Sequence, residues 1–182
     1  APATLTFTLD TAVAAPVIAL TADTGTNTSD GITRDGSYSV TGTEPGALVE
    51  YSTDGTSWTT TPPTAVEGAN TIQVRQTDVA GNVSAPATLT FTLDTAVAAP
   101  VIALDADTGS SGTDGVTQSG TYTVTGTEPG ALVEYSTDGT TWSTTAPVAV
   151  EGANTIQVRQ TDVAGNVSAP ATLTFTLDTA VA

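Results

Sequence analysis

The sequence lacks cysteine, histidine, methionine and lysine, and its basic residues are three arginines. Without cysteine, no disulfide can cross-link a small domain, so a common support of small secreted folds is missing. Without histidine or cysteine, the common nucleophile–base arrangements of enzymes cannot be built. We therefore expect no enzymatic activity.

Positive charge and long apolar runs are also scarce. The 19 acidic residues outweigh the arginines and give a formal net charge of −16, which destabilises a compact chain by self-repulsion. This charge argues against nucleic acid or an anionic membrane as partner, and a divalent cation would offset it. We expect no membrane insertion, because no apolar run of about 18 residues exists. No signal peptide leads the chain, so we expect a fragment of a longer protein whose export signal could lie elsewhere.

An internal repeat of 84 residues organises the chain. Residues 1–84 and 85–168 differ at 14 positions, and residues 169–182 begin a third copy. This period is too long for common solenoids and suits one small domain per repeat. We predict a terminal strand of a preceding repeat with its linker aspartate at 1–10, domains at 11–94 and 95–178, and the start of another repeat at 179–182.

Short segments in which apolar and polar residues alternate recur through each repeat, separated by Gly, Asp, Asn and Pro. This pattern predicts an all-β sandwich of about seven strands per domain. In the first repeat we expect Ile72 and Val74 to face the core, and Gln73 and Arg75 to face solvent. The expected strands are 16–20, 37–43, 47–53, two short ones near Trp58 and Ala65, 71–77 and 85–93, and residues 1–9 repeat the pattern of the last.

Carboxylates gather in the predicted turns. If successive strands alternate in direction, the turns at Glu44 and Asp78 share one end of a domain, and the loop 21–33 lies at the other. Calcium binds six to eight oxygens and tolerates irregular loops better than magnesium does. The predicted calcium ligands are Asp10, Asp23, Asp30, Asp78, Asp94, Asp107, Asp114, Asp162 and Asp178, with Glu128 as a further candidate at the joint between the domains.

An alternative reading of these aspartates stays open, because aspartate commonly caps its own turn. Known motifs do not decide the matter. The segment DADTGS at 105–110 begins like an EF-hand loop, but its bidentate glutamate is missing.

Several motifs taken together resemble a known family. The segments DTAVAAP, DTG…SDG, TEPG and DVAGN, the last followed by a strand and DT, resemble the bacterial Ig-like repeats in the extender regions of giant secreted adhesins. These adhesins include repeats-in-toxin and biofilm-associated surface proteins. The segment TTTPPTAVEGAN is shorter than in the usual form of the family, so no calcium ligand is transferred to it.

The resemblance implies two tandem Ig-like β-sandwich domains and calcium at or near the domain joints. It also implies type I secretion to the bacterial cell surface and a spacer role that projects a distal adhesive domain. The expected partners are neighbouring repeats of the same chain, and we expect a monomer in isolation.

Two other functions stay open. A carbohydrate- or protein-binding module could use Trp58 and Trp142, although a packing role is the expectation for both. The second open function is a glycoside hydrolase that uses a pair of carboxylates. Near-identical neighbouring repeats, however, favour a role in which repetition adds length over a catalytic role.

Overall fold

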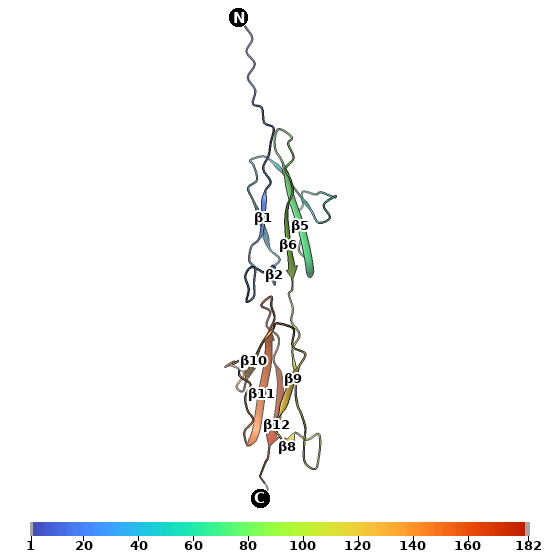
Figure 1. Ribbon diagram of the computed structural model, residues 1–182, viewed down its shortest axis with the longest axis vertical. Helices are drawn as coiled ribbons and strands as arrows, with labels where there is room; N and C mark the ends of the chain where they lie inside the picture. Colours follow the sequence, from blue (N-terminus) through green and yellow to red (C-terminus); the bar gives the residue numbers. More distant parts are fainter. Residues whose placement is uncertain (1, 181–182) are drawn as a thin grey trace. The chain divides into compact units, whose positions relative to one another are not determined.

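The computed structural model describes residues 2–180, and every regular element in this range is a β-strand. The chain divides into two compact units, Ala1–Asp94 (unit 1) and Thr95–Ala182 (unit 2). Figure 1 shows both units, with labels on most of their strands. Among the described residues, no helix is long and apolar enough to cross a membrane. The prediction of an all-β fold is confirmed.

Each unit has six strands in the same order. Those of unit 1 are β1 (Val17–Leu20), β2 (Ile32–Thr33), β3 (Tyr38–Thr41), β4 (Leu48–Ser52), β5 (Gly68–Thr77) and β6 (Ala87–Leu93). Those of unit 2 are β7 (Val101–Leu104), β8 (Val116–Thr117), β9 (Tyr122–Thr125), β10 (Leu132–Ser136), β11 (Gly152–Thr161) and β12 (Ala171–Leu177).

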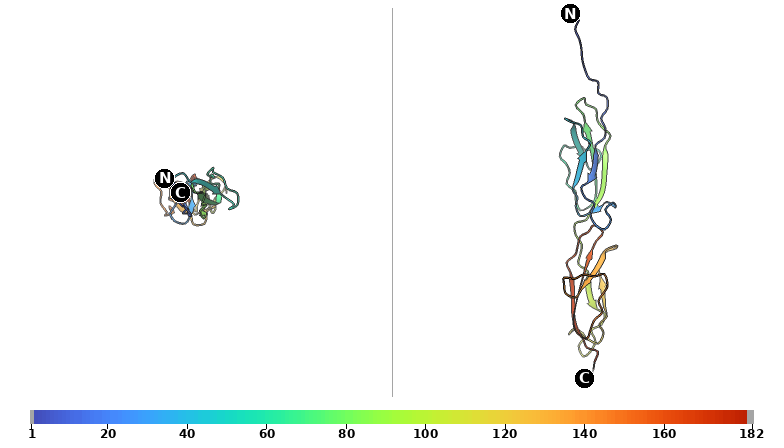
Figure 2. Two further views of the ribbon diagram at one scale, coloured as in Figure 1. Left: turned by 90° about the horizontal axis from the view of Figure 1, so that it is seen from above. Right: turned by 90° about the vertical axis from the view of Figure 1, so that its left-hand side faces the viewer.

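The strands of unit 1 form two sheets. Strands β1 and β3 pair antiparallel in one sheet, and the other has the order β2-β6-β5-β4. Within the larger sheet β5 is antiparallel to both β4 and β6, whereas β2 is parallel to β6. Strand β1 lies alongside β5 and β6 (Figures 1 and 2). Unit 2 repeats this topology with β7-β9 and β10-β11-β12-β8.

The core of unit 1 lies between these two sheets. Ile72 and Val74 are 2% and 0% exposed, and they pack with Ile18, Phe91 and Leu93. The alternation along β5 therefore correctly identifies the buried face. Ile102, Ile156, Val158 and Phe175 form the equivalent core of unit 2.

Two of the seven predicted strands are not complete strands. Near Trp58, a single isolated bridge joins Tyr51 and Thr59, and no strand forms at Ala65. Pro62 and Pro63 lie between these positions and have no backbone N–H to contribute to a ladder. Conversely, the predicted loop 21–33 ends in β2.

The expected strand at residues 1–9 pairs with no strand over its described residues 2–9. Leu5 and Phe7 are 82% and 77% exposed, whereas Phe91, which occupies the position of Phe7 in an identical ten-residue sequence, is 5% exposed. Alternation marks a segment that can form a strand, but the strand requires a partner to supply its ladder of hydrogen bonds.

Candidate metal centre

Three carboxylates meet at one end of unit 1. Oxygens of Asp10, Glu44 and Asp78 all lie within 4.8 Å of one another. Asp10 lies in the segment before β1, Glu44 lies in the turn between β3 and β4, and Asp78 directly follows β5. Asp10 is exposed, Glu44 is half-buried and Asp78 is buried. The prediction that the Glu44 and Asp78 turns share one end of the domain is confirmed.

The turn after β5 fixes the carboxylate of Asp78. The backbone N–H of Asn82 donates to Asp78 Oδ1 at 2.8 Å, and Asn82 Nδ2 donates to Asp78 Oδ2 at 2.7 Å. Gly81 has φ +91°, a left-handed conformation that favours glycine. The hydrogen bond from the Asn82 side chain, assisted by backbone N–H groups of the turn, lowers the pKa of Asp78 and favours its charged form.

Glu44 begins the tight turn predicted at Glu-Pro-Gly. The backbone N–H of Ala47 donates to the carbonyl of Glu44 at 3.1 Å, and Gly46 supplies a positive φ of 83°. The backbone N–H of Glu44 in turn donates to Gln76 Oε1 at 2.8 Å. This bond ties the turn to the end of strand β5.

Gln76 joins all three segments that carry the carboxylates. Its side chain is completely buried, and besides accepting from Glu44 it donates from Nε2 to the carbonyls of Ala14 (2.8 Å) and Gly42 (3.2 Å). The backbone N–H of Gln76 donates to Ser84 Oγ at 3.0 Å. In unit 2, Gln160 makes the same contacts with Glu128, Ala98, Gly126 and Ser168.

The segment before β1 is held from the other side by Asn82. Its Nδ2 donates to the backbone carbonyl of Asp10 at 3.2 Å, in addition to its bond with Asp78. The carboxylate of Asp10 itself accepts a 3.4 Å bond from the N–H of Ala12. The position of Asp10 therefore depends on the same turn that presents Asp78.

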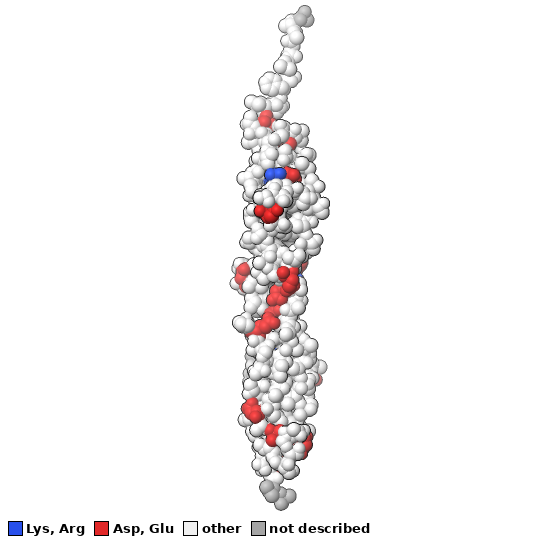
Figure 3. Space-filling view, turned by 90° about the vertical axis from the view of Figure 1, so that its right-hand side faces the viewer, with Lys and Arg blue, Asp and Glu red and all other residues white. Residues whose placement is uncertain are grey.

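The carboxylates of the centre are not neutralised by the ion pairs found among the described residues. Those pairs join Arg75 to Glu50 and Arg159 to Glu134, each at 3.0 Å. The face shown in Figure 3 likewise carries many acidic atoms and few basic ones. Like charges about 4 Å apart repel by about 1 kcal/mol in water and about 4 kcal/mol near a protein surface. A divalent cation would convert this repulsion into attraction.

The donor set matches the chemistry of calcium. Three carboxylates provide six oxygens in total, and water can complete a coordination number of six to eight. The oxygens come from an exposed linker, a turn and a second turn, so the geometry can adjust. Magnesium demands a near-ideal octahedron and is the poorer match.

Two other predicted ligands of unit 1, Asp23 and Asp30, cap their own loop. Asp23 Oδ2 accepts from the N–H of Gly31, and Asp30 Oδ1 accepts from the N–H of Ile32, each at 2.9 Å. Neither belongs to the carboxylate cluster found among the described residues of unit 1. Asp23 Oδ1 is buried and has no hydrogen-bond partner among those residues. Asp94 follows β6, and its N–H donates to the carbonyl of Thr33 at 2.9 Å.

The same local bonds recur in unit 2. Asp107 and Asp114 accept from the N–H groups of Gly115 and Val116 at 2.9 and 3.0 Å. Asp178 Oδ1 accepts from the N–H of Ala180 at 3.3 Å, and Asp162 is bonded to Asn166 as Asp78 is to Asn82. By the 84-residue period, the sequence equivalents of Asp10, Glu44 and Asp78 are Asp94, Glu128 and Asp162.

Sequence reasoning did not assign roles to Glu44, Gln76 and Asn82. A signal for Gln76 is present, because the alternation of Ile72 and Val74 continues inward to position 76, where a buried amide must find partners. Asn82 follows Asp78 in an ordinary turn sequence, and no pattern distinguishes it from a turn residue without a second function.

Comparison with known proteins identifies the family. Residues 8–95 and 96–179 each match the family described as bacterial Ig-like domain, whereas no curated protein matches. Among solved structures, the fibronectin(III)-like modules of Clostridium thermocellum CbhA share 17% sequence identity with a TM-score of 0.43, and the match covers 88% of this chain and 94% of that one. The two family matches span nearly the whole chain, which therefore belongs to the bacterial Ig-like domain family and carries two such domains in tandem.

Proposed function

We propose that this chain is a pair of extender repeats from a bacterial cell-surface adhesin, stiffened by calcium, and that it serves as a spacer for a distal adhesive domain. The observation that carries the proposal is the meeting of Asp10, Glu44 and Asp78 within 4.8 Å. A linker carboxylate and two carboxylates of the sandwich share this centre, so one bound ion would tie the linker to the domain.

The near-identity of the two repeats supports a spacer. They differ at 14 of 84 positions, and ten of these differences fall between residues 21 and 39. Ig-like domains are typically non-catalytic, and their repetition adds length. Secretion by the type I route and residence at the cell surface belong to the same proposal, and they rest on the resemblance of the sequence motifs.

The proposal extends to the second repeat by sequence equivalence. Asp94, Glu128 and Asp162 occupy the sequence positions of Asp10, Glu44 and Asp78, and each is a proposed calcium ligand on that ground. Asp23, Asp30, Asp107, Asp114 and Asp178 keep a weaker claim as ligands. Their hydrogen bonds serve their own loops, although the buried Oδ1 atoms of Asp23 and Asp107 have no partner among the described residues.

Calcium titration of the full chain tests the centre. We expect the melting temperature to rise between EDTA and about 10 mM calcium, because free calcium tenfold above Kd stabilises one site by about 1.4 kcal/mol. Extracellular calcium sites commonly have a Kd of about 0.1–1 mM. Magnesium at the same concentration should give a smaller shift. An unmoved melting curve would contradict calcium binding.

Matched variants locate the ion. The change Asp10→Asn/Glu44→Gln/Asp78→Asn keeps the side-chain shapes and should abolish the calcium shift of unit 1. The control Asp23→Asn/Asp30→Asn also removes carboxylates from unit 1, but it should keep the calcium-dependent rise in melting temperature. If the control loses it and the first variant does not, the ion lies in the loop 21–33.

Small-angle X-ray scattering of the full chain tests the stiffening role separately. We expect a narrower distribution of particle dimensions with calcium than with EDTA. Identical profiles, together with a calcium-dependent melting temperature, would show that calcium stabilises the domains without stiffening the chain.

A further inference from the structure

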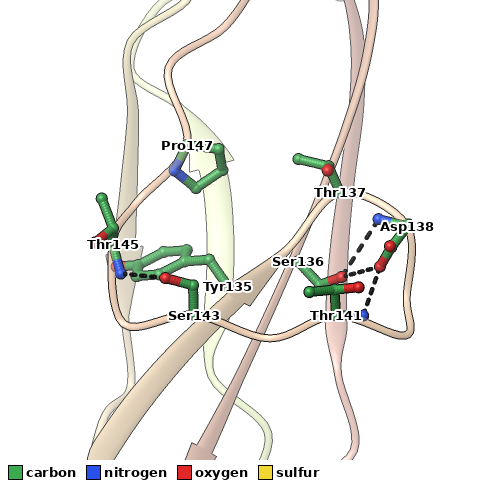
Figure 4. A pocket seen from close by; sticks show the side chains of 8 residues that line it. All are labelled: Tyr135, Ser136, Thr137, Asp138, Thr141, Ser143, Thr145 and Pro147. Atoms are coloured by element: carbon green, nitrogen blue, oxygen red, sulfur yellow. Dashed lines mark hydrogen bonds between the residues drawn. The ribbon is translucent and has the colours of Figure 1, made fainter.

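A second feature recurs in both units, away from the carboxylate centre. A cavity of about 340 Å³ in unit 1 lies between the hairpin that follows β4 and the segment that leads to the prolines, and one of about 330 Å³ lies at the equivalent place in unit 2. In unit 1 its lining includes Tyr51, Asp54, Trp58, Thr59, Thr61 and Pro63. Figure 4 shows Tyr135, Asp138, Ser143, Thr145 and Pro147 around the cavity of unit 2.

Aromatic rings form the rigid part of this cavity. Tyr51 packs against the core of unit 1, and the guanidinium of Arg75 lies 4.1 Å from the centre of the Trp58 ring. Arg75 is itself held by its 3.0 Å ion pair with Glu50. Trp142, Arg159 and Glu134 repeat these contacts in unit 2, but there Tyr135 is the aromatic residue that lines the cavity. Trp58 is half-buried and remains partly accessible from the cavity, so packing does not account for its whole surface.

A fixed carboxylate, that of Asp54, lines the cavity of unit 1. Asp54 Oδ1 accepts from Ser52 Oγ (3.0 Å) and from the N–H groups of Thr56 (2.8 Å) and Ser57 (2.7 Å). A carboxylate offers about four lone-pair positions over its two oxygens. Because these three bonds converge on Oδ1, Oδ2 of Asp54 retains the capacity to accept from a ligand hydroxyl.

Hydroxyl groups line the remaining wall and persist between the repeats. Thr59 of unit 1 is replaced by Ser143 in unit 2, and Ser57 is replaced by Thr141. Both exchanges alter a methyl group and keep the hydroxyl. In Figure 4 the Ser143 hydroxyl accepts from the backbone N–H of Thr145 at 3.1 Å, which leaves its own hydrogen available to a ligand.

We propose that each cavity binds one ring of a neutral carbohydrate. The aromatic side chains, Tyr51 and Trp58 in unit 1 and Tyr135 in unit 2, present an apolar surface to the C–H face of a pyranose. Asp54 or Asp138, with the neighbouring hydroxyls, can bond the hydroxyl groups of the sugar. The volume lies at the lower end of the 300–1,000 Å³ typical of ligand sites, which suits one sugar ring. The net charge of −16 disfavours an anionic ligand.

Because the site is repeated, it can serve a function in addition to the proposed spacer role. Each cavity is open to solvent, so a single sugar ring should bind weakly. Two equivalent sites 84 residues apart in the sequence allow one polysaccharide to engage both. When geometry permits, the overall affinity of two linked sites can exceed that of either site by 10²–10⁴. An array of repeats would then bind a glycan matrix along its length, independently of any distal domain.

Titration of the full ¹⁵N-labelled chain tests the proposal. The probes are methyl pyranosides of glucose, galactose and mannose, with a decaproline peptide and inorganic phosphate as alternatives. We expect at least one pyranoside to give saturable shifts at the backbone amides of Thr59, Thr61 and their unit 2 equivalents. The calcium centre plays no part in this readout.

A matched pair of variants places the ligand. Thr61→Tyr/Thr145→Tyr puts a bulky ring at two exposed positions that line the cavities, and should weaken pyranoside binding at least tenfold. Thr60→Tyr/Thr144→Tyr changes the adjacent exposed residues, which do not line them, and should leave binding unchanged. Equal binding by both variants overturns the proposal, as does the absence of shifts with every pyranoside. Shifts with decaproline alone identify a peptide site, and shifts with phosphate alone an anion site, and either result also overturns it.

Discussion

Gln76 Oε1 accepts a 2.8 Å hydrogen bond from the backbone N–H of Glu44, which lies 32 residues earlier in the sequence. The side chain of Gln76 is completely buried, so this bond is made where water cannot replace it. A turn that carries one carboxylate of the candidate metal centre is thereby anchored to strand β5. The same amide also reaches Ala14 and Gly42, and it therefore couples the stability of the sandwich to the geometry of the centre.

The first prediction concerns this amide. Gln76→Leu/Gln160→Leu should lower the free energy of unfolding of each unit by at least about 1–3 kcal/mol, because each change leaves the buried partners of the amide without a hydrogen bond. Urea unfolding of the full chain measures the loss. Gln73→Leu/Gln157→Leu is the control, since these side chains lie on the opposite face of the same strands and are half-buried. Equal losses in the two double variants would contradict the role of Gln76.

Much of the fold could be predicted from local pattern, and the centre only in part. Alternation along 71–77 identifies the buried face because the period of a strand is two residues. Strand direction places the Glu44 and Asp78 turns at one end. The approach of Asp10 to them depends on the buried amide of Gln76 and on Asn82, and these bonds span up to 72 residues of sequence, which no local pattern encodes.

The second prediction concerns a close approach of two small residues. A Cβ added to Gly36 would lie 2.7 Å from Cβ of Ala65 and 3.3 Å from Cδ2 of Leu93. Gly36 does not have a positive φ, so the obstacle to a side chain there is steric. Gly36→Ala should destabilise unit 1 by about 1–3 kcal/mol. Thermal unfolding measures the loss, and Gly36→Ala/Ala65→Gly should recover part of it. If the second change adds a further loss instead, the contact with Ala65 is not the cause.

This contact also explains why sequence reasoning misjudged the segment around Ala65. The segment is held by close packing against Gly36, and the Tyr38 hydroxyl donates to the carbonyl of Pro63 at 2.7 Å. Neither interaction requires a ladder of backbone hydrogen bonds. The pattern of an apolar residue between turn residues therefore predicts a short strand here, although the segment packs against the sandwich without pairing with a strand.

The last prediction is a pH dependence that arises in the hairpins. Backbone N–H groups of Ser57 and Thr56, with the side chains of Ser57 and Ser52, hold the pKa of Asp54 well below its usual range, and Asp138 is held equally low by Thr141, Thr140 and Ser136. A carboxylate whose pKa is lower in the folded state than in the unfolded state stabilises the fold fully above the unfolded value, about 3.9, and less as the pH falls toward the folded value. Asp54→Asn/Asp138→Asn retains a side-chain oxygen for the same N–H groups but carries no charge, so its contribution should not titrate. We expect the variant to unfold at a lower urea concentration than the wild type at pH 6, and the difference to narrow at pH 2. If the difference in urea midpoint between variant and wild type is the same at pH 6 and pH 2, the charge of these aspartates adds no stability beyond the hydrogen bonds of the turn.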